Sequence, residues 1–245
     1  MNSEFRELWK AAGYHSGCGS AAVMPPPPPH LIRVYHLTSA EHAISNIGLG
    51  RLKVSTFSDL NDPFELLAAN FRTKYVREVV RAFKKEYSAH TGLLCFSSDW
   101  LNPVLWSHYA SKHKGICLGF DLDRRLSRIV NYEEDRPELP IKAGNQSIDD
   151  SLRDLLLCTK YKHWEYEGEI RTFVKLKSAI QEGGLYFYPF GTDLQLKEVI
   201  VGSECPISLE SVRALTSQKY TEAVTFKARL ALKWFSVVPK ESTVP

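Results

Sequence analysis

An acidic row precedes a basic residue in the segment Trp164-Glu165-Tyr166-Glu167-Gly168-Glu169-Ile170-Arg171. If this segment is a β-strand, its period of two places Glu165, Glu167, Glu169 and Arg171 on one face. Three like charges in a row repel one another, and the repulsion should raise the pKa of at least one carboxyl group. The pattern therefore favours a site that handles protons or a cationic transition state. The alternative is a solvated strand face on which Arg171 serves only as an ion-pair partner.

Within this row, Glu169 is the best catalytic candidate, because Arg171 is its nearest neighbour on the same face. Glu167 is the second candidate.

His36 lies near the end of the segment Leu31–Leu37, just before a capping-box pattern that starts at Thr38. Backbone N–H groups at a helix start suit an anion or a ribose hydroxyl, so His36 and Thr38 are candidates for binding a nucleotide. The alternative for His36 is a partly buried imidazole bonded to a carbonyl group.

Two further segments carry polar and aromatic residues. Asn61-Asp62-Pro63-Phe64-Glu65 has the composition of a turn, although Asp62 or Glu65 could project into a cleft. His108 and Tyr109, on a short helix, could line a pocket, where the imidazole and the aromatic ring would stack on a flat ligand. The alternative is that the helix face that contains Tyr109 packs in the core and has only a structural role.

The elements predicted along the chain do not alternate regularly between strand and helix. We therefore expect an α+β fold with a largely antiparallel, split or sandwiched sheet and flanking helices. Residues 1–30 should be a disordered or weakly helical proline-rich tail, and residues 31–240 one α+β domain. Helices are expected at 38–48, 74–87, 103–111, 148–161 and 209–218, and strands at 31–37, 51–56, 93–97, 115–120, 129–132, 164–173, 185–188, 198–201, 223–226 and 232–238.

Composition sets outer bounds on function. The chain has 245 residues, a net charge of +3 and five cysteines, an odd number without a C-x-x-C pair. This favours a reducing, cytoplasmic setting over a disulfide framework. No apolar run approaches the ~20 residues of a transmembrane helix, so we expect no membrane partner. The mild basicity leaves nucleic acid as a weakly supported partner, and no zinc spacing or other metal site is expected.

Several motifs together resemble a bacterial family catalogued as a domain of unknown function, number 2971. They are Asn61–Glu65, Cys95-Phe-Ser97, Trp106-Ser-His-Tyr-Ala110, His113–Phe120 and Trp164–Arg171. This resemblance implies no activity.

The order of His36, then Ser97 or Tyr109, then Glu167-Gly-Glu169 also resembles the ADP-ribosyltransferases of the histidine type. That resemblance implies an ADP-ribosyltransferase-like fold and NAD as a substrate. Glu169 would stabilise the cationic ribose, Glu167 would act on the incoming nucleophile and His36 would bind the adenosine ribose.

Under the same resemblance, Tyr109 would stack on nicotinamide, and Thr38, Ser97 and Arg171 would complete the binding site. The function expected is thus NAD-dependent ADP-ribosyl transfer or NAD hydrolysis, with bacterial phage defence as a setting and an unknown acceptor. Two alternatives stay open: a metal-dependent nuclease or phosphoesterase using Asp62, Glu65, Glu167 and Glu169, and a non-catalytic effector module that binds a nucleotide-like ligand.

Overall fold

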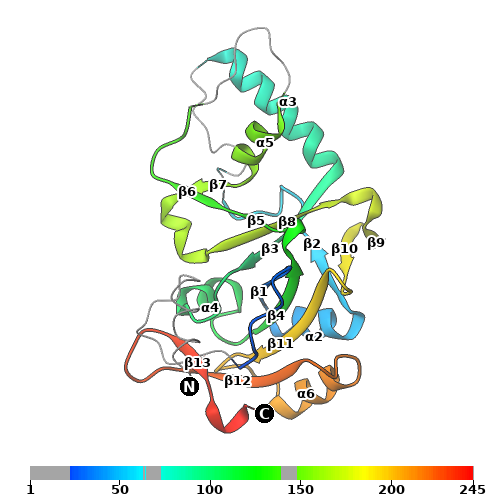
Figure 1. Ribbon diagram of the computed structural model, residues 1–245, viewed down its shortest axis with the longest axis vertical. Coiled ribbons are helices and arrows are strands. Elements are labelled where there is room, and N and C mark those ends of the chain that lie inside the picture. Colours follow the sequence, from blue (N-terminus) through cyan, green and yellow to red (C-terminus); the bar gives the residue numbers. More distant parts are fainter. Residues whose placement is uncertain (1–22, 63, 65–72, 139–147, 245) are drawn as a thin grey trace.

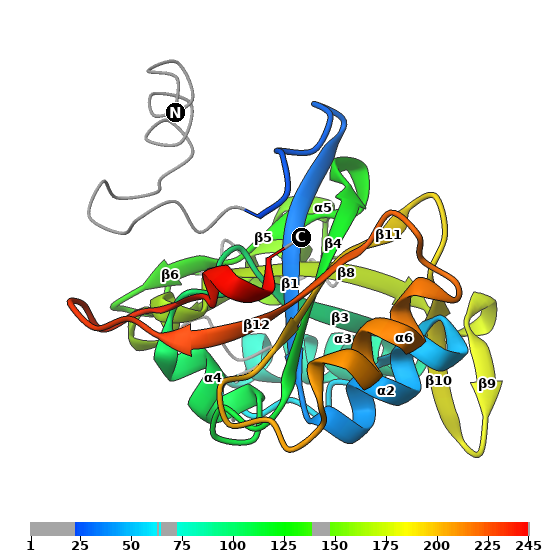
Figure 2. The ribbon, with the colours of Figure 1, turned by 90° about the horizontal axis from the view of Figure 1, so that it is seen from below.

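The computed structural model describes residues 23–62, 64, 73–138 and 148–244. Its largest element is an eight-stranded sheet with the order β13-β12-β11-β4-β1-β3-β8-β5 (Figures 1 and 2). Every neighbouring pair in this sheet is antiparallel except β11 and β12. The prediction of an α+β fold with a largely antiparallel sheet and flanking helices is therefore confirmed.

The strands of the large sheet are β1 (Leu31–Thr38), β3 (Thr91–Ser97), β4 (Ile116–Asp123), β5 (Arg128–Ile129), β8 (Glu169–Lys175), β11 (Leu194–Val201), β12 (Val224–Leu230) and β13 (Val237–Pro239). A three-stranded sheet holds β2 (Arg51–Val54), β10 (Leu185–Pro189) and β9 (Ile180–Glu182), and a parallel pair holds β6 (Asn131–Glu133) and β7 (Thr159–Tyr161). The helices are α2 (Ala40–Leu49), α3 (Lys74–His90), α4 (Pro103–Tyr109), α5 (Asp150–Leu157) and α6 (Leu209–Ser217).

Helices lie on both faces of the large sheet, and alternating side chains of one strand serve both layers. Leu118 of β4 packs in the cluster that also holds Ile47 of α2 and Val212 of α6. Its neighbour Cys117 packs with Trp106 of α4 on the opposite face. Since β4 is buried along its whole length, it forms the centre of the core.

Local sequence explains where the helices near the site begin and end. Helix α2 starts at a Ser39 side chain that accepts from the His42 N–H, one residue later than the capping box predicted, and ends at Gly50 in the left-handed conformation (φ 67°). Helix α4 has the predicted Asn102 cap and Pro103 in its first turn.

Some predicted boundaries are wrong. The helix expected over 148–161 ends at Leu157 and is followed by β7, and the strand expected over 129–132 is divided between β5 and β6. Most of the strand expected over 232–238 is an irregular loop before β13. The first 22 residues of the expected tail lie outside the described residues. Within the described part of the chain, no helix has both the length and the apolar composition needed to cross a bilayer.

Candidate functional site

The strands β1 and β3 pair at a single position, Tyr35 opposite Ser97, whereas β1 pairs with β4 over its full length. A cavity of about 240 Å³, here called the site cavity, lies at this limited contact. Among the residues that line it are His36, Ser97, Tyr109, Glu167 and Glu169. Five candidates chosen from the sequence are thus brought to one cavity.

The sheet register explains why residues so distant in sequence meet. Tyr35 on β1 lies opposite Ser97 on β3, and Ser97 lies opposite Glu169 on β8. Two strand spacings of about 4.8 Å each separate β1 from β8, so groups on these strands can reach one small ligand. Helix α4 packs against β1 and supplies Tyr109 at its last residue.

The acidic segment is not the continuous strand that the sequence predicted. Lys162–Glu167 form a 3₁₀ helix, Gly168 adopts the left-handed conformation (φ 49°), and β8 begins at Glu169. A Cβ at Gly168 would lie 2.5 Å from Ser98 Oγ, so this turn requires glycine. The turn leaves Glu165 exposed and buries Glu167 and Glu169, so the three carboxylates do not share one face.

Two cations neutralise the two buried carboxylates. Lys160 Nζ lies 2.7 Å from Glu167 Oε2 and 2.8 Å from Glu169 Oε2. Arg171 binds both oxygens of Glu169, with Nε 2.8 Å from Oε1 and Nη2 3.1 Å from Oε2, and its Nη1 donates to the Leu157 carbonyl at 2.6 Å. All four side chains are almost fully buried, so the cluster pairs two negative charges with two positive charges inside the protein.

Repulsion within the acidic row predicts a raised pKa for at least one carboxyl group, but the pKa of Glu169 is lowered. Burial opposes ionisation of the Glu169 carboxyl, but attraction to Arg171 and Lys160 outweighs burial and lowers its pKa to about 2. Glu169 is therefore a carboxylate at any physiological pH. Its backbone N–H also donates to the Tyr132 hydroxyl at 2.8 Å.

Tyr109 connects the loop after β2 to the carboxylates. Its hydroxyl accepts from Asn61 Nδ2 at 2.8 Å and donates to Glu167 Oε1. Burial raises the pKa of Tyr109, and the bond to the Glu167 carboxylate raises it further, so Tyr109 keeps its proton. Ser97 Oγ donates to the Glu167 carbonyl at 2.6 Å and accepts from the Asp99 N–H at 3.1 Å, which makes it a brace for the turn.

His36 is half-buried, and its Nδ1 lies 3.2 Å from the Cys95 carbonyl. Burial lowers the pKa of His36 and outweighs that contact. A neutral ring that donates from Nδ1 to the carbonyl keeps Nε2 as a hydrogen-bond acceptor. His36 thus has the hydrogen bond to a carbonyl group that the sequence analysis gave as the alternative to nucleotide binding. The same residue also lines the site cavity.

Two other candidates do not line the site cavity. Thr38 ends β1 beyond His36, and Arg171 is fully buried behind Glu169. Sequence reasoning missed Lys160, because that residue fell in the segment assigned to a helix. Lys160 lies five residues before the acidic row. Assigning Thr159–Tyr161 to a strand would have indicated that Lys160 could pair with these carboxylates.

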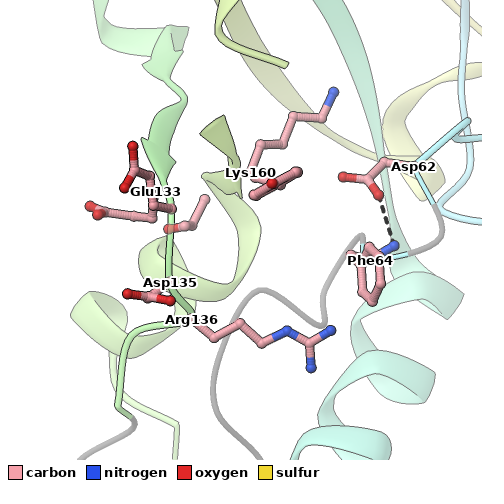
Figure 3. A pocket seen from close by; sticks show the side chains of 9 residues that line it. Asp62, Phe64, Glu133, Asp135, Arg136 and Lys160 are labelled. Atoms are coloured by element: carbon pink, nitrogen blue, oxygen red, sulfur yellow. Dashed lines mark hydrogen bonds between the residues drawn. The ribbon is translucent and has the colours of Figure 1, made fainter. Parts of the chain in front are cut away.

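A second cavity of about 280 Å³ adjoins the cluster and shares Lys160 with the site cavity (Figure 3). Asp62 lines this second cavity and accepts from the Phe64 N–H at 2.9 Å, the turn bond that the sequence favoured. The Arg136 guanidinium lies 4.7 Å from the centre of the Phe64 ring. Asp62 and the carboxylates Glu167 and Glu169 thus line different cavities.

Metal ligation was the basis of the nuclease alternative. Glu65 lies outside the described residues. Among those described, no group of three His, Cys, Asp or Glu side chains is arranged to hold a metal ion.

Residues 105–172 match a family model described as a protein of unknown function (DUF2971). The resemblance to domain family 2971 is confirmed over this segment, which contains Tyr109, Lys160, Glu167, Glu169 and Arg171. His36 and Ser97 lie outside it. No curated protein and no solved structure matches the chain significantly, and the resemblance to ADP-ribosyltransferases stays a prediction.

Proposed function

We propose that the site cavity binds NAD and that its carboxylates promote cleavage of the bond between nicotinamide and ribose. The protein would be an NAD glycohydrolase if water accepts the ADP-ribose and an ADP-ribosyltransferase if another molecule does. The observation that carries this proposal is the convergence of His36, Tyr109, Glu167 and Glu169, from three strands or turns and one helix, on one cavity. Consumption of NAD would suit a role in bacterial phage defence.

The reaction assigns each residue a chemical task. As the C1′–N bond breaks, its electron pair leaves with nicotinamide, and positive charge develops on the ribose. Glu169, held ionised by Arg171, would stabilise that charge. Glu167 would orient the nucleophile and accept the proton that the nucleophile loses as it bonds to C1′. His36 Nε2 would accept from a ribose hydroxyl.

The size of the cavity limits what it can hold. A volume of about 240 Å³ suits one nucleoside-sized portion of a dinucleotide rather than the whole molecule. Lys160 lines both cavities, and since its ammonium group is held between Glu167 and Glu169, it would position these carboxylates. Arg171 would position Glu169 without touching the substrate.

One observation favours a second candidate, a module that binds a nucleotide without cleaving it. Because Lys160 and Arg171 neutralise the two carboxylates, the cluster offers a cationic transition state less attraction than free carboxylates would. A metal-dependent nuclease has weaker support, since the same cations occupy the oxygens that a metal ion would need.

The choice of variant decides the test. Glu169→Gln would leave Arg171 buried without its carboxylate, which typically costs about 3–5 kcal/mol and threatens the fold. Glu167→Gln keeps the pair of Glu169 with Arg171 and removes one carboxylate from the cavity. It is therefore the sharper substitution.

The experiment follows nicotinamide release from NAD by NMR, with a bacterial lysate supplying acceptors, for the wild-type protein and Glu167→Gln. We expect release by the wild type and a loss of at least about 100-fold in Glu167→Gln, the usual size of a contribution from a positioned acid or base. NAD titration of both proteins by NMR separates the candidates. Binding by the wild type without release would support the binding module, and neither binding nor release would refute both.

A further inference from the structure

The turn between β12 and β13 carries an unusual set of exposed apolar side chains. Phe235 is 101% exposed, Leu232 95% and Trp234 55%, and Leu230 at the end of β12 is 53% exposed. Figure 2 shows this loop, residues 231–236, extending away from the body of the protein. A contiguous apolar group of this kind on a soluble surface typically marks an interaction site.

The base of this loop is ordered, so the tip has a defined position. Leu230 pairs with Val237 across the two strands, and the Ala231 N–H donates to the Ser236 carbonyl at 2.9 Å. Val237 is fully buried in the cluster with Trp100 and Phe226, and its N–H donates to the Leu101 carbonyl at 2.7 Å. The chain thus anchors residues on both sides of the tip and leaves the aromatic residues outside.

The chain segment that carries the tip is basic, although Glu222 and Glu241 lie directly beyond its two ends. The segment from Ala223 to Lys240 contains Lys227, Arg229, Lys233 and Lys240 and no Asp or Glu. Aromatic residues beside basic residues suit the interface of an anionic bilayer, where the rings enter the headgroup region and the cations bind lipid phosphates.

We propose that the tip formed by Leu232, Lys233, Trp234 and Phe235 docks the protein on an anionic membrane surface. A protruding tip with a fully exposed phenyl ring can insert into the headgroup region of a bilayer, where lipids surround the ring. Contact between two copies through this tip would bring two basic loops together, which like-charge repulsion opposes. The expectation of no membrane partner rested on the lack of a spanning segment, and a peripheral contact needs none.

The test is co-sedimentation of the full chain with vesicles of phosphatidylcholine alone and of phosphatidylcholine mixed with anionic phosphatidylglycerol. We expect preferential binding to the anionic vesicles, weakened by added salt. Because Trp234 and Phe235 are the two aromatic side chains of the tip, Trp234→Ser/Phe235→Ser should weaken binding by about tenfold or more. The matched control is Leu49→Ser, which removes an exposed apolar side chain (59%) at the end of α2 and should leave binding unchanged.

A spectroscopic readout separates docking from misfolding. Anionic vesicles should shift the tryptophan emission of the wild type to the blue, and Trp234→Phe should keep the binding but lose this shift. The proposal is overturned by equal binding to both vesicles, by no binding, or by unchanged binding of the double variant. A concentration-dependent dimer that the double variant abolishes, without vesicle binding, would also overturn it and assign the tip to a second copy.

Discussion

Lys160 gives the candidate site its electrostatic character. Its buried ammonium group lies within 2.8 Å of an oxygen of Glu167 and of Glu169. Two carboxylates this close repel each other strongly in a medium of low polarity unless a cation lies between them. Lys160 therefore stabilises the turn that brings both carboxylates to the cavity.

Replacing Lys160 by methionine should lower the free energy of unfolding by about 3–5 kcal/mol, because two buried carboxylates lose their shared partner. Urea denaturation measures the change. The matched control is Lys162→Met, which removes an exposed lysine 3.1 Å from Glu134 and should leave the free energy of unfolding almost unchanged. Equal effects of the two substitutions would refute the bridging role.

His36 should titrate below the ordinary histidine range, because burial lowers its pKa. NMR titration of the imidazole signals, with His36→Asn to assign them, measures this value. Since the folded-state pKa lies below the unfolded value of about 6.5, the contribution of His36 to stability is complete above pH 6.5 and declines as the pH falls below it. A pKa at or above 6.5 would contradict the neutral, carbonyl-bonded ring.

At the scale of elements, the turn at Gly168 divides the acidic segment into a 3₁₀ helix and a strand. The Gly168 carbonyl accepts from the Ser98 N–H at 2.9 Å, which joins the turn to the end of β3. This contact places Glu167 and Glu169 beside Ser97. The left-handed backbone and the close approach to Ser98 both demand glycine.

Gly168→Ala should therefore destabilise the protein more than the same substitution at a glycine that also has a positive φ but has no close neighbour. Gly183 supplies that control, since its φ is 57° and a Cβ there meets nothing within 4 Å. We expect about 1–2 kcal/mol for Gly183→Ala and a larger loss for Gly168→Ala, partly restored by Ser98→Ala. Thermal denaturation measures both losses, and equal losses would show that the contact with Ser98 does not matter.

At the scale of the whole molecule, the order β1-β3-β8 in the sheet assembles the site. These strands come from the beginning, middle and later part of the chain, and the 3₁₀ helix and α4 close around them. The same sheet carries the basic, aromatic tip at its other edge, on β12 and β13. The proposed catalytic and docking surfaces therefore lie on the same sheet.

The buried charge cluster should govern stability in acid. The pKa of Glu169 is lowered from 4.5 to about 2, so its stabilising effect is present above pH 4.5 and is lost as the pH falls towards 2. The size of this effect is on the order of 3 kcal/mol. The test is urea denaturation between pH 5 and pH 2 of the wild type and of Glu169→Gln/Arg171→Met, which removes both members of this ion pair. The free energy of unfolding should fall less in the double variant than in the wild type. Identical pH profiles would contradict the lowered pKa of Glu169.

The sequence by itself determined the class of fold and most of the candidate residues. Apolar periodicity and capping residues are local signals, which is why α2, α4 and the buried strands could be predicted from neighbouring residues. The types and order of His36, Ser97, Tyr109, Glu167 and Glu169 also identified the residues that line one cavity. Their catalytic roles stay a prediction.

Only the tertiary structure decided the charge state and geometry of that site. The left-handed turn at Gly168 depends on Ser98, seventy residues earlier, and the acidic pattern alone therefore indicated a continuous strand. Arg171 pairs with Glu169 two residues away on β8, as the sequence indicated, whereas Lys160 reaches both carboxylates only because β7 packs against the 3₁₀ helix that ends at Glu167. The contact of Lys160 with both carboxylates arises from tertiary packing, and the period-two pattern of the acidic segment does not contain it.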